Sequence, residues 1–263
     1  MAGWMTILSL NGHNLYVEEA GPADGRAIIL LHHGLGSLKS WRKQFPVLAA
    51  HGYRVIGYDR WGYGRSDPRP GFSMPLFKED VKDLVSLMDY YDLEKAVLTG
   101  HSDGGTIALY CGAQYPQRVS LLVTVAAHIY LEEKMEPGIE GLRQMYEDQP
   151  KFREALRREH GDKVDDVFYG WYGGWREEEN LDWDMRPSLK HITCPVLVVQ
   201  GLDDEHATPQ HARDIAAQIK DAELWLVPGA GHMLPQDNPP EFNDRLLDFS
   251  QKCHANERQS VVS

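Results

Sequence analysis

The sequence predicts an α/β protein built on a mostly parallel β-sheet. Short runs rich in β-branched residues alternate with segments of helical periodicity along most of the 263 residues. This alternation is typical of parallel strands joined by crossover helices. Residues 27–33 begin with the apolar run Ala-Ile-Ile-Leu-Leu, as expected of a strand buried on both faces of a sheet. One stretch, residues 128–187, contains no good strand and interrupts the alternation.

Eight strands are expected. The first two, residues 6–10 and 13–19, form a hairpin, because Asn11 and Gly12 between them are a strong signal for a tight turn. The remaining strands are expected at residues 27–33, 53–58, 95–99, 121–126, 195–200 and 222–227. Amphipathic helices lie between them, for example at residues 78–91, where the apolar side chains recur on one helical face.

The interrupting stretch is interpreted as an insertion. It follows one core strand, precedes another, and is dense in acidic, basic and aromatic residues. We therefore predict a core of residues 1–127 and 188–263 and a helical cap of residues 128–187. The cap is expected over the carboxyl edge of the sheet, where open α/β sheets bind ligands.

Composition limits the classes of partner. The chain carries 39 acidic and 27 basic side chains, a formal charge of −12, which repels nucleic-acid phosphates and anionic lipids. We therefore expect no nucleic-acid and no membrane partner. No apolar run reaches 18 residues, no leader pattern is found, and the three cysteines lack a C-x-x-C spacing. A cytoplasmic protein is expected. No cluster has metal-ligand spacing, so neither metal nor cofactor is expected.

A serine nucleophile is predicted at Ser102. The segment Gly-His-Ser-Asp-Gly-Gly, residues 100–105, fits the pattern G-x-S-x-G. The strand expected at residues 95–99 precedes it, and a helical pattern at residues 106–113 follows. This strand–turn–helix context presents a serine side chain at a sharp turn, which leaves room only for small residues two positions before and after it. Glycines stand at both of those positions.

A serine nucleophile needs a base, and the base needs an orienting acid. In this strand–turn–helix setting, they follow the serine in the order acid, then histidine. His232 comes just after the last expected strand and is the predicted base. The acid is expected on the loop after residues 195–200, where Asp203, Asp204 and Glu205 are consecutive. The local sequence leaves the choice among these three open.

The remaining histidines are weighed by their placement. His101 adjoins the nucleophile and is expected to point away from Ser102 into local packing, whereas His128, at the mouth of a core strand, is a candidate for the pocket wall. Six others show no convergent placement and are expected at the surface: His13, His160, His191, His206, His211 and His254.

Taken together, these motifs resemble the α/β-hydrolase superfamily along essentially the whole chain. The motifs are His-Gly-Leu-Gly at 33–36, Asp-Arg-Trp-Gly-Tyr-Gly-Arg-Ser at 59–66, the elbow at Ser102, and the Gly-x-x-Asp and Gly-His segments at 201–204 and 231–232. The resemblance implies an eight-stranded, mostly parallel sheet flanked by helices, with a helical cap inserted after the sixth strand. It also implies that Asp59 and Arg60 are structural, as a turn carboxylate and an ion-pair partner.

The same resemblance implies a mechanism. Asp204, three residues after Gly201, is the implied acid, with Asp203 in reserve, and the backbone N–H groups of Leu35 and Asp103 form the oxyanion hole. The implied activity is hydrolysis of a small carboxylic ester or lactone through an acyl-enzyme on Ser102. Thioesters, amides and carbon–carbon bonds next to a carbonyl are cleaved by the same constellation. Some members of the superfamily are instead small-molecule receptors with slow turnover.

Candidate substrate-binding residues are Asp103, His128, Trp171 and Trp175. Four aromatic residues recur on one helical face, at Phe168, Trp171, Tyr172 and Trp175. This face either docks the cap onto the core or forms an aromatic pocket wall. Asp103 follows the nucleophile directly, and a similar elbow occurs in hydrolases of α-amino acid esters, where the aspartate holds the substrate ammonium. That resemblance implies the same contact here, unless the carboxylate pairs within the core.

Overall fold

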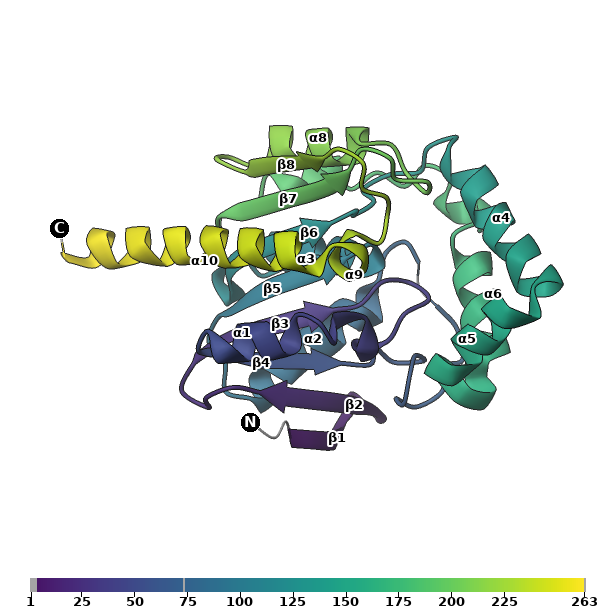
Figure 1. Cartoon of the computed structure of the whole chain (residues 1–263), viewed down its shortest axis with the longest axis horizontal. Helices are drawn as coiled ribbons and strands as arrows, with labels where there is room; N and C mark the ends of the chain where they lie inside the picture. The colour runs from purple at the N-terminus through teal and green to yellow at the C-terminus, as the bar shows by residue number, and fades with distance from the viewer. Residues whose placement is uncertain (1–3, 73, 263) are drawn as a thin grey trace.

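A computed structural model describes residues 4–72 and 74–262. Its centre is a sheet with strand order β1-β2-β4-β3-β5-β6-β7-β8 (Figure 1). The strands are β1 (Trp4–Leu10), β2 (His13–Ala20), β3 (Arg26–Leu31), β4 (Tyr53–Tyr58), β5 (Ala96–His101), β6 (Val119–Val125), β7 (Val196–Gly201) and β8 (Glu223–Val227). Strands β3 to β8 are parallel, and the β1–β2 hairpin joins β4 antiparallel. The predicted eight-stranded, mostly parallel sheet is therefore confirmed, with each strand end within two residues of its expected place.

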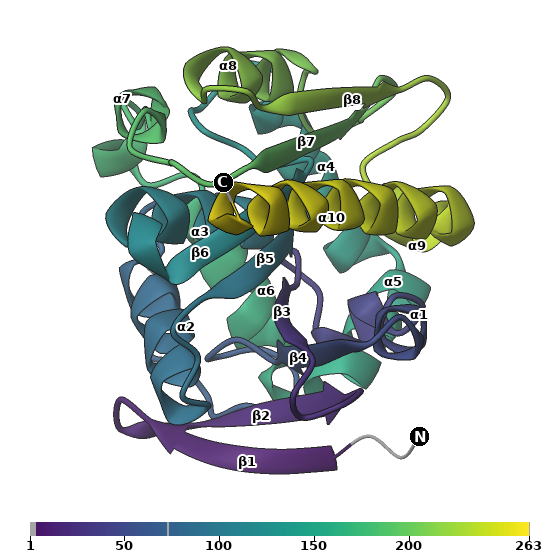
Figure 2. The ribbon, with the colours of Figure 1, turned by 90° about the vertical axis from the view of Figure 1, so that its left-hand side faces the viewer.

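Helices cover both faces of the sheet (Figure 2). Helices α1 (Phe45–Ala50) and α10 (Pro239–Val262) cover one face, and α2 (Lys78–Tyr90), α3 (Asp103–Gln114) and α8 (Gln210–Gln218) cover the other. Strand β3 shows why its sequence is continuously apolar. Ile28 and Leu30 pack into the cluster with α1 and α10, whereas Ile29 and Leu31 pack into the opposite cluster.

The helices that follow β6 lie together beyond the carboxyl ends of the parallel strands (Figure 1). They are α4 (Met135–Asp148), α5 (Pro150–His160) and α6 (Val164–Gly174), and the short α7 (Arg186–Leu189) leads back to β7. The remaining short elements are α9 (Leu234–Asp237) and the 3₁₀ helices η1 (Leu38–Trp41), η2 (Pro116–Arg118), η3 (Gly161–Lys163) and η4 (Glu178–Asn180). No helix in the described ranges is long and apolar enough to cross a lipid bilayer. The division into core and cap at residues 128 and 187 stays a prediction.

Specific hydrogen bonds attach α4–α6 to the loops at the strand ends. At the end of α5, His160 Nδ1 accepts the backbone N–H of Gly64 at 3.0 Å, and its Nε2 faces the carbonyl oxygen of Leu35 at 3.1 Å. Since Nδ1 is an acceptor, Nε2 carries the proton and the ring is neutral. Just before α4, Lys134 Nζ donates to the carbonyl oxygens of Asp204 and Ala207. The helices are thus fastened to the Leu35 loop and to the Asp204 loop.

Candidate active site

Ser102 occupies a strained turn between β5 and α3. Its backbone has φ 54° and ψ −121°, a sparsely populated region for a residue with a side chain. Its N–H donates to the carbonyl of Val125 at 2.8 Å. A Cβ on Gly100 would lie 2.1 Å from the carbonyl oxygen of Gly104, and one on Gly104 would lie 2.2 Å from that of Leu31. The two glycines are required because strand and helix backbones touch there.

His232 and Asp204 meet through their side chains. His232 Nδ1 lies 2.9 Å from Asp204 Oδ2, and both residues are buried. Gln200 Nε2 also donates to Oδ2 at 2.7 Å, and the backbone N–H groups of His206 and Ala207 donate to Oδ1 at 2.8 and 3.2 Å. Burial alone would raise the pKa of Asp204, but the hydrogen bond and charge of His232, with the His206 N–H, hold it well below its usual range. An ionised Asp204 keeps the proton on Nδ1, so His232 Nε2 is left as the basic nitrogen.

The other two acids of this loop do not reach the imidazole ring. Asp203 is exposed, and among the described residues only its backbone N–H is engaged, donating to the carbonyl of Ala230. Glu205 Oε2 accepts the backbone N–H of His232 at 3.1 Å. Asp204 is therefore the one of the three that contacts the side chain of His232.

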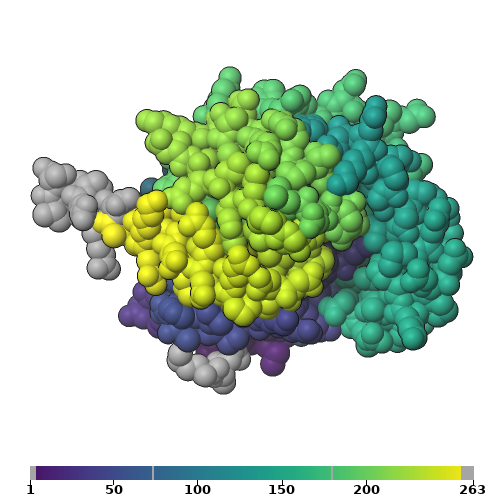
Figure 3. Space-filling view, turned by 45° about the horizontal axis from the view of Figure 1, so that its top comes forward, coloured from purple at the N-terminus to yellow at the C-terminus, as the bar shows by residue number. Residues whose placement is uncertain are grey.

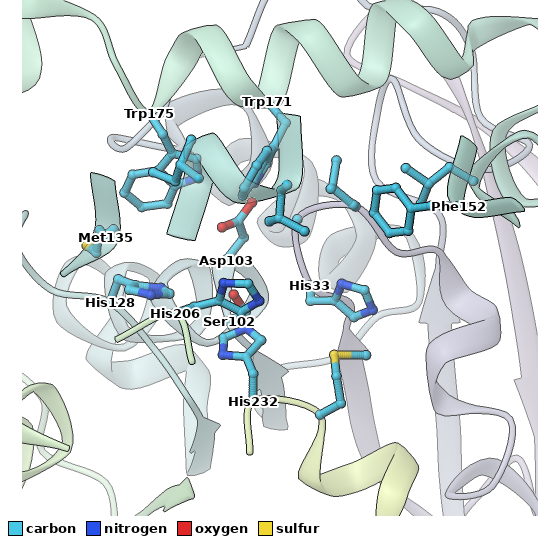
Figure 4. Close-up of a pocket in the computed structure, with 16 residues that line it drawn as sticks. His33, Ser102, Asp103, His128, Met135, Phe152, Trp171, Trp175, His206 and His232 are labelled. Atoms are coloured by element: carbon cyan, nitrogen blue, oxygen red, sulfur yellow. The ribbon is translucent and has the colours of Figure 1, made fainter. Parts of the chain in front are cut away.

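Ser102 and His232 line a cavity of about 290 Å³ (Figure 4). Helices α4–α6 supply a largely apolar wall, including Met135, Phe152 and Trp171. The other candidate substrate-binding residues, Asp103, His128 and Trp175, also line it. A small cavity whose wall from α4–α6 is largely apolar fits a substrate whose non-reacting part is apolar.

Two residues that line the cavity together with Ser102 have unengaged backbone donors. Leu35 and Asp103 both line the cavity, and within residues 4–72 and 74–262 neither backbone N–H has a hydrogen-bond acceptor. Gly34, directly before Leu35, has no room for a side chain, because a Cβ would lie 2.2 Å from Trp171 Nε1 and 2.7 Å from Asp103 Oδ2. Unengaged N–H groups that face a cavity are suited to an oxyanion.

Asp103 belongs to a chain of buried charges. Its Oδ2 lies 3.6 Å from Arg60 Nη2 without a hydrogen bond. Arg60 Nη1 pairs with Asp80 at 3.1 Å, and Asp80 pairs with Arg69 at 2.9 Å. All four residues are more than nine-tenths buried. Burial raises the pKa of Asp103 to about 6, against the opposing effect of Arg60. Asp103 thus lines the cavity and also faces a cation of the core, and Arg60 is an ion-pair partner as predicted.

Asp59 is likewise a turn carboxylate, as predicted. Its oxygens accept the backbone N–H groups of Leu38 at 2.7 Å and Arg65 at 2.8 Å. His101 points away from the nucleophile, as expected: its Nε2 lies 2.8 Å from the carbonyl oxygen of His232, and burial lowers the pKa of His101 to about 3.

The surface prediction was wrong for four histidines. His206 lines the cavity, and its ring packs edge-on against His232 at 4.7 Å between centroids. The others are buried among distant partners: His13, His160 and His211. His13 Nε2, for example, lies 2.9 Å from Asp83 Oδ2. Burial of these rings depends on residues far away in sequence. His206 is the cavity-lining residue that was missed, and its place two positions after Asp204 was the one local indication of it.

Comparison with known proteins identifies the family of the chain. Residues 26–170 match the model of a family described as alpha/beta hydrolase fold. The chain is 31% identical to serine hydrolase BPHL of Homo sapiens over 93% of this chain and 85% of the relative. It is 28% identical to 2-hydroxy-6-oxo-6-phenylhexa-2,4-dienoate hydrolase of Burkholderia cepacia over 91% and 92%. The crystal structure of the enol-lactonase from Burkholderia xenovorans has the same fold, with a TM-score of 0.76 and 21% identity, and the match covers 94% of this chain and 100% of that one. The chain therefore belongs to the α/β-hydrolase family, as its ordered motifs predict.

Proposed function

We propose that the protein hydrolyses a small carboxylic ester or lactone through an acyl-enzyme on Ser102. The observation that carries the proposal is the 2.9 Å contact between His232 Nδ1 and Asp204 Oδ2, at a cavity that His232 shares with a serine held in a strained turn. A buried, oriented imidazole beside a hydroxyl is the arrangement that makes serine nucleophilic.

The proposed reaction has two halves. Ser102 Oγ attacks the acyl carbon while His232 Nε2 takes the hydroxyl proton, and the N–H groups of Leu35 and Asp103 stabilise the resulting oxyanion. The tetrahedral intermediate collapses, and His232 donates the proton to the departing alkoxide. Water then attacks the acyl-enzyme with His232 as base, which releases the acid and restores Ser102. Asp204 stabilises the imidazolium in both halves. Each oxyanion donor contributes about 3–4 kcal/mol in comparable hydrolases.

Trp171, Trp175 and His128 are proposed to contact the non-reacting part of the substrate. The two indoles offer apolar surface, and burial lowers the pKa of His128 well below its ordinary value. A neutral imidazole at that wall is compatible with an uncharged, largely apolar group.

Asp103 is proposed to accept an α-ammonium group of the substrate. Its Oδ2 has no hydrogen-bond partner among the described residues, but Arg60 already offsets its charge. We therefore expect a modest preference for α-amino esters over neutral esters. Asp103→Asn should lower the ratio of amino-ester to neutral-ester kcat/KM about tenfold. An unchanged ratio would mean that the carboxylate serves only the buried charge chain.

The proposed function is tested by turnover of p-nitrophenyl acetate and butyrate. We expect multiple turnover by the wild type, none by Ser102→Ala or His232→Ala, and labelling of Ser102 by a fluorophosphonate probe. Ester turnover that survives in Ser102→Ala would refute the mechanism. Labelling without multiple turnover on any ester would favour the slow-turnover receptor instead.

Cleavage of a carbon–carbon bond next to a carbonyl is the second candidate, favoured by the similarity to the dienoate hydrolase of Burkholderia cepacia. Hydrolysis of a thioester by Ser102, His232 and Asp204 is the third candidate reaction. A panel that contains a dienoate, a thioester and the p-nitrophenyl esters separates them. A kcat/KM for the dienoate or thioester that exceeds every ester by more than tenfold would reassign the bond that is cleaved.

A further inference from the structure

A second hollow of about 280 Å³ adjoins the active-site cavity. It lies between η1, α5 and α9, and we call it the vestibule. The two hollows share four wall residues: His33, Leu35, Leu156 and Met233. In Figure 4, His33 and Phe152 lie on one side of Ser102, and Met135 and His128 lie on the other. The vestibule therefore continues the cavity on the His33 side. The segments that line it, purple-blue, teal and yellow, adjoin one another on the face shown in Figure 3.

The vestibule is positively charged although the protein carries −12 overall. Three cations, Lys39, Arg42 and Lys43, line it within five consecutive residues, and Glu159 is the single acid in its wall. Lys39 Nζ lies 3.7 Å from Glu159 Oε2, so these two charges offset each other. Lys43 and Arg42 remain as a surplus of two positive charges.

Neither surplus cation has an acidic partner among the described residues. Lys43 Nζ donates to the carbonyl oxygen of Gln236 at 2.9 Å, a neutral acceptor that leaves its charge intact. The guanidinium of Arg42 is exposed and has no side-chain partner in the part of the chain that the structure describes. Ser40 and the amide of Gln236 add neutral polar groups to the same wall.

We propose that the vestibule binds a carboxylate at the far end of the substrate. The substrate is then an ester or lactone whose apolar body fills the cavity and whose anionic group reaches Arg42 and Lys43. This deepens the proposed function and rests on it. The physical reason is that a concave, cationic mouth on a negatively charged protein attracts anions locally while the rest of the surface repels them. Because Arg42 and Lys43 are solvent-exposed, the gain is moderate and depends on salt.

Two substrate series test the proposal and find which side of the ester carries the anion. In the first, p-nitrophenyl monoesters of dicarboxylic acids with four to eight carbons are compared with esters of monocarboxylic acids of equal length. In the second, butyrate esters of ω-hydroxy acids are compared with butyrate esters of the matching alcohols. We expect about tenfold higher kcat/KM for the carboxylated member at one chain length in one series, mainly through KM. The preference should shrink as NaCl is raised from low salt to about 0.5 M.

Charge-reversal variants locate the effect. Arg42→Glu with Lys43→Glu should bring the ratio of carboxylated to neutral kcat/KM to one or below. The matched control, Lys190→Glu with Lys220→Glu, changes the net charge equally at exposed positions that do not line the vestibule, and should leave the ratio at its wild-type value. An equal loss in both double variants would mean that net charge, and not the vestibule, causes the preference.

Binding to Ser102→Ala separates this proposal from the proposed function. Calorimetry uses the pair from whichever series shows the preference: monomethyl adipate against methyl hexanoate for the acyl side, or the butyrate ester of 6-hydroxyhexanoic acid against hexyl butyrate for the alcohol side. The carboxylated member should bind about tenfold more tightly, with no turnover required. Ester hydrolysis without a carboxylate preference in either series overturns the vestibule proposal alone. Tighter binding of the carboxylated ester without hydrolysis of any ester overturns the proposed function alone.

Discussion

Replacing Asp204 by Asn isolates the orienting role of the acid. The carboxylate receives four donors: the N–H groups of His206 and Ala207 at Oδ1, and Gln200 Nε2 and His232 Nδ1 at Oδ2. An asparagine that keeps its oxygen on the two backbone N–H groups must turn its NH₂ toward Gln200 and His232. His232 Nδ1 then has to accept, which moves the ring proton to Nε2 and removes the basic nitrogen from Ser102.

We therefore expect Asp204→Asn to lower kcat for p-nitrophenyl butyrate about 10³–10⁴-fold, as the wrong tautomer does in other serine hydrolases, equivalent to about 4–5.5 kcal/mol of transition-state stabilisation. KM should change little, since no substrate contact is lost. Asp203→Asn is the matched control and should cost less than threefold, because the Asp203 side chain is exposed. Initial rates on variants with wild-type circular dichroism give both numbers. Asp204→Asn activity above a tenth of wild type, or an equal loss in Asp203→Asn, would refute the assignment.

Three further outcomes are expected. Gly104→Ala places a Cβ 2.2 Å from the carbonyl oxygen of Leu31. This overpacking against the backbone should lower the free energy of unfolding by about 2–3 kcal/mol and the Tm by about 5–10 °C. An unshifted Tm would contradict the close approach. The ratio of amino-ester to neutral-ester kcat/KM should fall as the pH drops below about 6. The reason is that the pKa of the Asp103 carboxyl is raised to about 6, so the group loses its charge in that range. A ratio that does not change with pH would exclude the ammonium contact. His160→Ala should lower stability by about 1–3 kcal/mol at pH 8 in urea titrations. The stability difference between wild type and His160→Ala should shrink below pH 6.5. Burial lowers the pKa of His160 in the folded state, so the stability that its neutral ring contributes is lost as the pH falls. A stability difference that grows on acidification would show that the ring is charged.

The backbone of the site was predictable because its signals are local. Strand β5, the glycines around Ser102 and the start of α3 are all encoded within about fifteen residues. The family resemblance then singled out Asp204 among three consecutive acids. The structure adds the physical reason, since the loop folds back so that the His206 and Ala207 N–H groups fix Oδ1.

The pairings across the fold were not predictable. Asp103 faces Arg60, and His160 contacts Gly64 and Leu35, partners 96 and 125 residues away in the chain. The sequence of a polar helix predicts a surface position for its histidine, because the distant groups that hydrogen-bond the ring become known only from the fold. The ring contact of His206 with His232 is a pairing of the same kind, since His232 comes from a different strand end.

The attachment of helices α4–α6 has a consequence for how the protein selects ligands by size. His160 holds the carbonyl of Leu35, and Lys134 holds the carbonyl of Asp204. A bulky ligand that forces these helices outward would therefore also pull on the loops of Leu35 and Asp204, which carry a proposed oxyanion donor and the proposed partner of the base. We expect oversized molecules to bind with ordinary affinity but to react slowly, because the reacting groups are then misaligned. Selectivity for size is expected to appear as a fall in kcat rather than as a rise in KM.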